Sequence, residues 1–212
     1  MALLHVARLV HPRLHVLHVD HGLRAEASEE RNFVTSVCLE LGLPCSIHIA
    51  KDLREKAAER GDGLEATGRA ERYGWFGEVV GQGGVVLTGH HRNDQRETQL
   101  LHWLRGSKAS AWSGMEAWST ERGYAVGRPF LDVAKADLKA WMEDHGHGWR
   151  EDPSNVDPAF LRNRVRHELL PLLDSLRPGW SAGMERHGLI AQEWQAHAAS
   201  WLDQLPGPPH VL

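Results

Sequence analysis

The sequence has few cysteines and no long apolar run. Cys38 and Cys45 are the only cysteines among its 212 residues, too few for a disulfide framework and without the spacing of a zinc site. A membrane-spanning helix needs roughly 18 or more consecutive apolar residues, and no segment offers them. Residues 1–10 also lack the basic start and the small-residue cleavage site of a signal peptide. We therefore expect a cytoplasmic protein with no membrane partner.

Neither sign of charge dominates the chain. Its formal net charge is −4, and 25% of its residues are charged against 42% hydrophobic, which is ordinary for a globular domain. A nucleic acid would therefore have to meet a local basic patch rather than a basic whole. Histidine is frequent, with 15 copies, but no His or Cys pair has the spacing of a zinc site, so we assign no residue to a metal.

Expected strands alternate with expected helices along most of the chain. The expected helices cover 2–10, 28–41, 64–80, 136–145, 160–173 and 180–202, the strands cover 14–19, 45–49, 85–87 and 124–131, and the loops include 51–63 and 107–119. This alternation predicts an α/β fold with a doubly wound, mostly parallel sheet over residues 1–150. A C-terminal helical extension over 151–205 and a tail over 206–212 are expected to follow.

The segment 88–98, Thr-Gly-His-His-Arg-Asn-Asp-Gln-Arg-Glu-Thr, is the most informative part of the sequence. An apolar run precedes it and a helical pattern follows, so it is expected at the carboxyl end of a strand, where open α/β sheets bind ligands. Asp94 and Glu97 stand three apart and share one face of the first helical turn. The pair suits a cation, either an ammonium group or a metal, and equally suits a cluster that only caps the helix.

Six motifs follow one another in an order that resembles the tRNA(Ile)-lysidine synthetases, a family of the PP-loop ATP pyrophosphatase superfamily. They are His-Val-Asp-His-Gly-Leu-Arg (18–24), Leu-Glu-Ala-Thr-Gly-Arg-Ala-Glu-Arg-Tyr (64–73), His-His-Arg-Asn-Asp-Gln-Arg-Glu-Thr (90–98), Arg-Pro-Phe-Leu (128–131), Glu-Asp-Pro-Ser-Asn (151–155) and Arg-Asn-Arg-Val-Arg-His (162–167). The resemblance runs from residue 1 to about residue 173. Any one of these motifs is weak, but six in order are specific.

The resemblance implies an adenine nucleotide alpha hydrolase-like, Rossmann-like fold and a two-step ligase reaction. ATP, with Mg²⁺, adenylates the C2 oxygen of the wobble cytidine in tRNA(Ile) with a CAU anticodon, and pyrophosphate leaves. The ε-amine of free L-lysine then attacks C2, which releases AMP and leaves lysidine. A homodimer is one assembly that the sequence leaves open.

The resemblance also implies roles for eight side chains. The roles are catalysis for Asp94, Glu97 and Arg162, lysine binding for Asp94 and Glu97, ATP or adenylate binding for Arg69, His90 and His91, and tRNA binding for Arg162, Arg166 and His167. Two carboxylates suit an ammonium group, and a guanidinium grips a phosphate with two parallel bonds. The alternative for Arg69, Arg162 and Arg166 is a set of solvated charges on exposed helix faces.

Two departures from the family stand out. Asn93 occupies the place of the first acid in the family's Asp-Asp pair, which removes a charge but keeps an acceptor oxygen. The family's Ser-Gly-Gly-x-Asp-Ser loop, whose backbone amides cradle pyrophosphate, does not occur in the sequence, and neither does the strand before it. That strand would lie between the expected strands at 14–19 and 85–87, and its absence would leave two unpaired edges.

We therefore expect the 212-residue chain to be unstable, inactive toward ATP, or both. The simplest explanation is that Met1 is an internal methionine of a longer protein. An alternative function is that of a non-catalytic or degenerate PP-loop remnant that binds tRNA or a partner. A related enzyme such as a tRNA thiolase is disfavoured, because Cys38 and Cys45 have neither the spacing nor the location of that group's paired cysteines.

Overall fold

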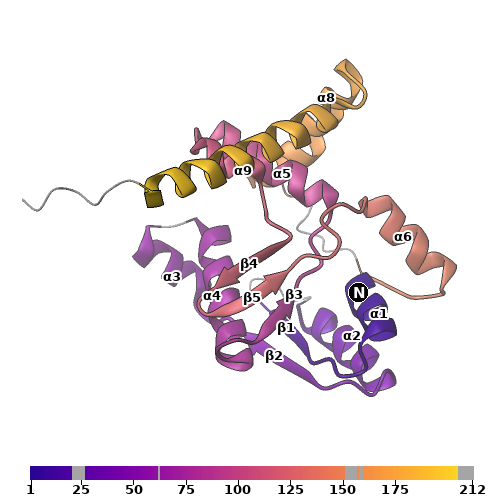
Figure 1. Ribbon diagram of the computed structural model, residues 1–212. Helices are drawn as coiled ribbons and strands as arrows, with labels where there is room; N and C mark the ends of the chain where they lie inside the picture. Colours follow the sequence, from indigo (N-terminus) through magenta and orange to yellow (C-terminus); the bar gives the residue numbers. More distant parts are fainter. Residues whose placement is uncertain (21–26, 62, 151–156, 158–159, 205–212) are drawn as a thin grey trace, which may run out of the picture. The chain divides into compact units, whose positions relative to one another are not determined.

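The computed structural model describes residues 1–20, 27–61, 63–150, 157 and 160–204 (Figure 1). Its elements are α1 Ala2–Val10, β1 Val16–Asp20, α2 Ala27–Glu40, β2 Cys45–Ile49, α3 Leu53–Arg60, α4 Leu64–Val80, β3 Val85–Leu87, α5 Arg92–Leu104, the 3-10 helix η1 Ala109–Ser113, β4 Trp118–Glu121, β5 Tyr124–Gly127, α6 Lys135–Asp144, α7 Leu161–Arg164, the π-helical turn η3 Val165–Leu169, α8 Leu170–Leu176 and α9 Trp180–Gln204. Within these described residues, no helix is both long and apolar enough to cross a membrane.

The chain divides into two compact units, which are described separately. Unit 1 consists of Met1–Gly89, Ala117–Phe130 and Ala136–Arg150, and unit 2 consists of His90–Glu116, Leu131–Lys135 and Glu151–Leu212. All the strands of the described residues belong to unit 1. Unit 2 is built from helices and the segments that join them.

The strands of unit 1 form two sheets. β1 and β2 pair in parallel from end to end, with Val16 opposite Cys45. β5 lies between β3 and β4, parallel to β3 and antiparallel to β4 (Figure 1). Parallel strands that alternate with helices confirm the predicted α/β class. No ladder joins β1 to β3 within the described part of the chain, so the expected single sheet is divided between these two strands.

The core of unit 1 lies between α4 and the sheet of β3 and β5. Tyr73 and Phe76 on α4 pack against Val86, Tyr124 and Val126, all of them buried. The Tyr124 hydroxyl donates to the Tyr73 carbonyl oxygen over 2.7 Å. Burial raises the pKa of Tyr124 to about 12, so this phenol remains a hydrogen-bond donor at neutral pH. This hydrogen bond, set within the apolar cluster, fixes the position of α4 along β5.

Two segments expected to be loops contain regular structure. Within 51–63 the chain forms α3, because Leu53 and Ala57 are buried and Lys56 forms an ion pair of 3.0 Å with Glu71 on α4. Charged residues surround these two apolar positions, which are only one turn apart, so the sequence shows no helical apolar pattern here.

Within 107–119 the chain forms η1 and the start of β4. The hairpin of β4 and β5 turns through Arg122 and Gly123, whose φ angles of 48° and 90° are both positive. Positive φ at both central residues matches the twist of a two-residue hairpin. Arg-Gly is a weaker signal of such a turn than Asn-Gly, which is why the sequence pattern did not reveal the hairpin.

The core of unit 2 joins α5 to the helices that follow residue 160. Leu100 and Leu101 pack against Val165 and Leu170 in one buried cluster. The run from α7 through η3 to α8 contains a π turn that ends at Leu169, two residues before Pro171. Proline lacks an N–H and its ring collides with the carbonyl four residues earlier, so a continuous α-helix cannot pass this position without strain. A wider turn is the usual relief.

Candidate functional site

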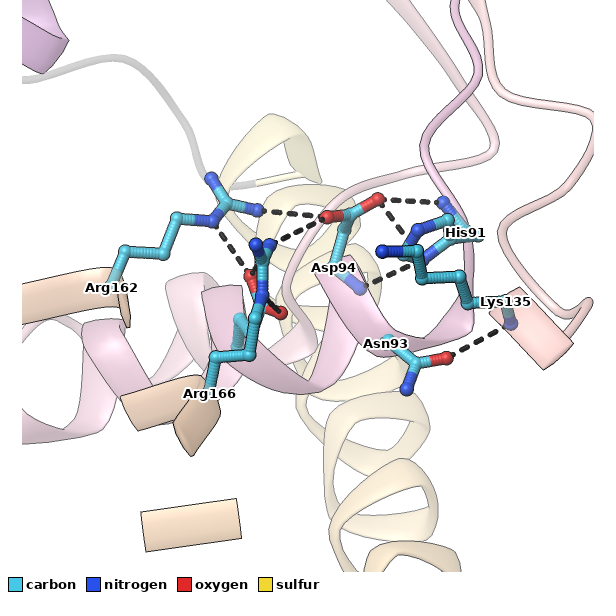
Figure 2. Close-up of polar contacts among 7 residues, drawn as sticks. His91, Asn93, Asp94, Lys135, Arg162 and Arg166 are labelled. Atoms are coloured by element: carbon cyan, nitrogen blue, oxygen red, sulfur yellow. Dashed lines mark hydrogen bonds and ion pairs between the residues drawn. The ribbon is translucent and has the colours of Figure 1, made fainter. Parts of the chain in front are cut away.

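The first turn of α5 is closed by a reciprocal pair of hydrogen bonds between His91 and Asp94. The His91 backbone N–H donates to Asp94 Oδ2 over 3.0 Å, and the Asp94 N–H donates to His91 Nδ1 over 3.3 Å (Figure 2). Such a capping box gives hydrogen-bond partners to two of the backbone N–H groups that have no partner within the helix at its N-terminus. Burial lowers the pKa of His91, although Asp94 and Glu97 act against that shift. The neutral ring keeps Nδ1 available as the acceptor that the cap requires.

Asn93 also contributes a structural bond. Its Oδ1 accepts the backbone N–H of Lys135, the first residue of α6, over 3.1 Å (Figure 2). An aspartate at this position could accept the same hydrogen bond, because Asn and Asp both carry an oxygen at Oδ1. The departure from the family's Asp-Asp pair therefore preserves this contact.

Glu97 is the most buried charge of the cluster, with none of its surface exposed. It accepts three short hydrogen bonds. Arg162 Nε donates to Oε2 over 2.8 Å, Arg166 Nε donates to Oε1 over 2.7 Å, and Arg166 Nη2 donates to Oε2 over 2.9 Å. Charge-assisted bonds of this length are the strong ones. Buried charges persist in proteins when they are paired in this way.

Asp94 is less buried and less tightly held. Its Oδ1 lies 3.4 Å from Arg162 Nη2 and 3.7 Å from Arg166 Nη2 (Figure 2). The exposed fraction of its side chain is 15%, against 26% for Arg162, 23% for Arg166 and 1% for Glu97. Solvent therefore reaches three of the four side chains, those of Asp94, Arg162 and Arg166.

The two arginines converge because they stand four residues apart on the run formed by α7 and η3. Val165 between them is buried in the core of unit 2. Asn163 Nδ2 donates to the Asp157 carbonyl oxygen over 2.9 Å, which ties the start of this run to the segment before it. Arg162 and Arg166 therefore share one face of this run, and both form ion pairs with Glu97 on α5.

The resemblance also assigned Arg69, His90 and His167. Arg69 belongs to unit 1, where its guanidinium lies 4.3 Å from the centre of the Tyr73 ring and 3.9 Å from a Glu121 oxygen, with 48% of its side chain exposed. His90 is half-buried and His167 is exposed, both in unit 2. The motif at 151–155 lies outside the described residues. The structure thus gathers Asp94, Glu97, Arg162, Arg166 and His91.

Neither carboxylate of the cluster fits a magnesium ion held by the protein. Protein-bound Mg²⁺ takes one or two carboxylates together with water or phosphate oxygens, whereas Asp94 and Glu97 both face guanidiniums. Elsewhere in the described ranges, no group of three or more His, Cys, Asp and Glu side chains gathers in a way that could hold a metal.

Comparison with known proteins gives a consistent family. A PP-loop domain family matches residues 1–173. The chain is 38% identical to the tRNA(Ile)-lysidine synthase of Pseudomonas fluorescens over 87% of its own length and 40% of the relative's. It is 42% identical to the synthase of Bradyrhizobium diazoefficiens, with coverages of 76% and 44%, and 34% identical to that of Nitratidesulfovibrio vulgaris, with coverages of 93% and 58%. The resemblance drawn from the six motifs is confirmed.

The chain spans about 40% of the length of the first of these relatives. Among solved structures it is similar to a U34-tRNA thiolase from Methanococcus maripaludis, with a TM-score of 0.69 over 90% of this chain and 68% of that one. At 11% sequence identity this likeness concerns the fold alone. It confirms the adenine nucleotide alpha hydrolase-like class expected from the sequence.

Proposed function

The chain belongs to the PP-loop family, and from that premise we propose that it carries lysine-binding and catalytic residues of a tRNA(Ile)-lysidine synthase. The protein would ligate free L-lysine to the wobble cytidine of tRNA(Ile) with a CAU anticodon, at the expense of ATP. Similarity to synthases of three bacterial groups supports this proposal. The observation that carries it is the cluster of Asp94, Glu97, Arg162 and Arg166 in unit 2.

The first step forms a bond between the cytidine C2 oxygen and the α-phosphorus of ATP and breaks the bond to pyrophosphate. Charge grows on the phosphate oxygens, which suits cationic donors held in place beforehand. Arg69 is the residue that we assign to the phosphates or the adenylate, with His90 and His91 beside the nucleotide. His91 uses Nδ1 to accept the Asp94 N–H, so this nitrogen is engaged in the helix cap and we do not assign it as a general base.

The second step forms a bond between the lysine ε-nitrogen and C2 and breaks the bond from C2 to the AMP oxygen. The ε-ammonium must lose one proton before attack and a second one after it. Asp94 is the more exposed of the two carboxylates, and we assign it to the amino acid. Arg162 bonds to both Asp94 and Glu97. We assign Arg162, Arg166 and His167 to the tRNA side of the reaction, where guanidiniums attract phosphate.

The direct test is transfer of radiolabelled lysine to tRNA. The substrate is a tRNA(Ile) transcript with the CAU anticodon, and the control is the same transcript with GAU. The chain is assayed alone and fused behind a strand that ends in the family's Ser-Gly-Gly-x-Asp-Ser loop. We expect the fused protein to label the CAU transcript only, and to lose this activity when Asp94→Asn is introduced. Label on both transcripts, or on neither, would contradict the proposal.

A further inference from the structure

The two cysteines of the chain lie on either side of a sharp reversal of the backbone in unit 1. Cys38 is near the C-terminal end of α2, and Cys45 is the first residue of β2. The Leu43 N–H donates to the Cys38 carbonyl oxygen over 2.9 Å, and Gly42 turns the chain with a φ angle of 66°. A left-handed residue at this position folds the chain back over the last turn of a helix. The start of β2 therefore lies next to the end of α2.

The side chain of Cys45 points to the face of the sheet that α2 covers. Side chains alternate between the two faces along a strand. His48, three residues after Cys45, bonds to a side chain of α4 over 3.2 Å, so Cys45 points to the opposite face. The parallel register of β1 and β2 places Asp20 of β1 on the same face as Cys45. Asp20 forms an ion pair of 3.2 Å with Arg31 on α2, and α2 contacts both strands (Figure 1).

The two thiols meet where α2 packs on β2. Both are free thiols in the structure, and a hydrogen bond joins them. Cys38 is 1% exposed, whereas Cys45 is half-buried. Burial and, after it, the neighbouring Cys45 raise the pKa of Cys38 to about 11, so Cys38 keeps its proton at neutral pH. A solute therefore reaches Cys45 first, and Cys38 stands behind it as a second thiol in contact.

We infer that Cys38 and Cys45 form a reversible dithiol–disulfide pair, which hydrogen peroxide oxidises and small thiols reduce. Peroxide transfers one oxygen atom to the Cys45 sulfur, which leaves a sulfenic acid and one water. The Cys38 sulfur then attacks the Cys45 sulfur, the S–O bond breaks, and the Cys38 proton leaves with the hydroxyl group as a second water. Two molecules of external thiol restore both cysteines and leave as one disulfide. The bond would fasten the end of α2 to β2, and the inference does not rest on the proposed function.

Oxidation of the wild-type chain is the direct test. Glu40 lies between the two cysteines, so a glutamate-specific protease places them on separate peptides that only a disulfide holds together. After treatment with a small molar excess of hydrogen peroxide, we expect mass spectrometry to find these two peptides joined within one chain. Both thiols should be lost to a thiol reagent and restored by dithiothreitol. Two surviving thiols, a disulfide formed only between chains, or sulfinic acid at Cys45 without a disulfide would overturn the inference.

A matched pair of variants tests the order of the two steps. In Cys38→Ala, Cys45 has no partner thiol, so its sulfenic acid should persist long enough for dimedone to trap it and should advance to sulfinic acid with more peroxide. In Cys45→Ala, the buried Cys38 should react with peroxide at least about tenfold more slowly than Cys45 does in Cys38→Ala. Equal rates in the two variants would overturn the assignment of Cys45 as the thiol that is oxidised first. The wild-type peptides test the disulfide itself even if a variant does not fold.

Discussion

Replacing Glu97 by glutamine should destabilise the protein much more than removing a neighbouring exposed charge. Glutamine keeps one acceptor oxygen but places an amide N–H₂ against two guanidiniums that now lack their buried anion. Breaking a buried ion pair costs about 3–5 kcal/mol. Because about a quarter of each arginine side chain is exposed, at 26% and 23%, water offsets part of this cost, and we expect a loss of about 2–4 kcal/mol.

For a chain of this size, such a loss lowers the melting temperature by about 5–15 °C. Differential scanning fluorimetry at pH 7 measures the shift. Glu168→Gln is the matched control, because Glu168 carries the same charge and pairs with Arg164 at 3.2 Å on the surface. An exposed pair is worth about 0–1 kcal/mol, so the control should melt within about 3 °C of the wild type. Equal melting of the two variants would refute the view that Glu97 holds the two arginines in place.

Three further predictions test other parts of the structure. The pKa of His91 is lowered below its ordinary value of 6.5, so the unfolded chain binds this proton more readily than the folded chain. The contribution of His91 to the free energy of unfolding should therefore be constant above pH 6.5 and fall as the pH drops below it. In urea titrations over this pH range, His91→Asn should reduce the dependence of stability on pH. Gly77→Ala would place a Cβ 3.1 Å from the buried Tyr124 ring, so chemical denaturation should show a net loss of stability of about 1 kcal/mol. Gly148 has open space around it, so the control Gly148→Ala should show no loss of stability. Asn93→Asp should keep the hydrogen bond to the Lys135 N–H and should have the stability of the wild type in chemical denaturation. Asn93→Ala loses this bond and should be less stable by about 1 kcal/mol in the same assay.

The sequence predicts the fold best where apolar spacing and chain breakers agree. The helices over Ala2–Val10 and Leu64–Val80 were expected at those bounds, because each has helical apolar spacing and ends at a proline or a glycine. The helix over Leu53–Arg60 was missed, because its stability comes from contacts with α4 rather than from its own pattern. Tertiary packing overrides local signals in this way when an element is short.

Spacing predicts the two pairs of charged residues in the cluster, but not the contacts between the pairs. Asp94 and Glu97 are adjacent on one helical turn, and Arg162 and Arg166 are adjacent on another, so each pair follows from spacing alone. The bond between Arg162 and Glu97 joins residues 65 positions apart, and no local pattern encodes a contact over that distance. It changes the interpretation of the site, because Glu97, expected from the resemblance to bind lysine, proves to be covered by the two arginines.

We propose that lysine binds at the cluster of Asp94, Glu97, Arg162 and Arg166. Arginine Nε–H signals in ¹⁵N NMR spectra report on it directly, since Arg162 and Arg166 each donate this group to the buried Glu97. We predict that titration with L-lysine moves both signals saturably while the Arg164 signal stays in place, and that Asp94→Asn abolishes the shifts. Lysine binding that left both signals unmoved would place the amino acid elsewhere and refute binding at this cluster.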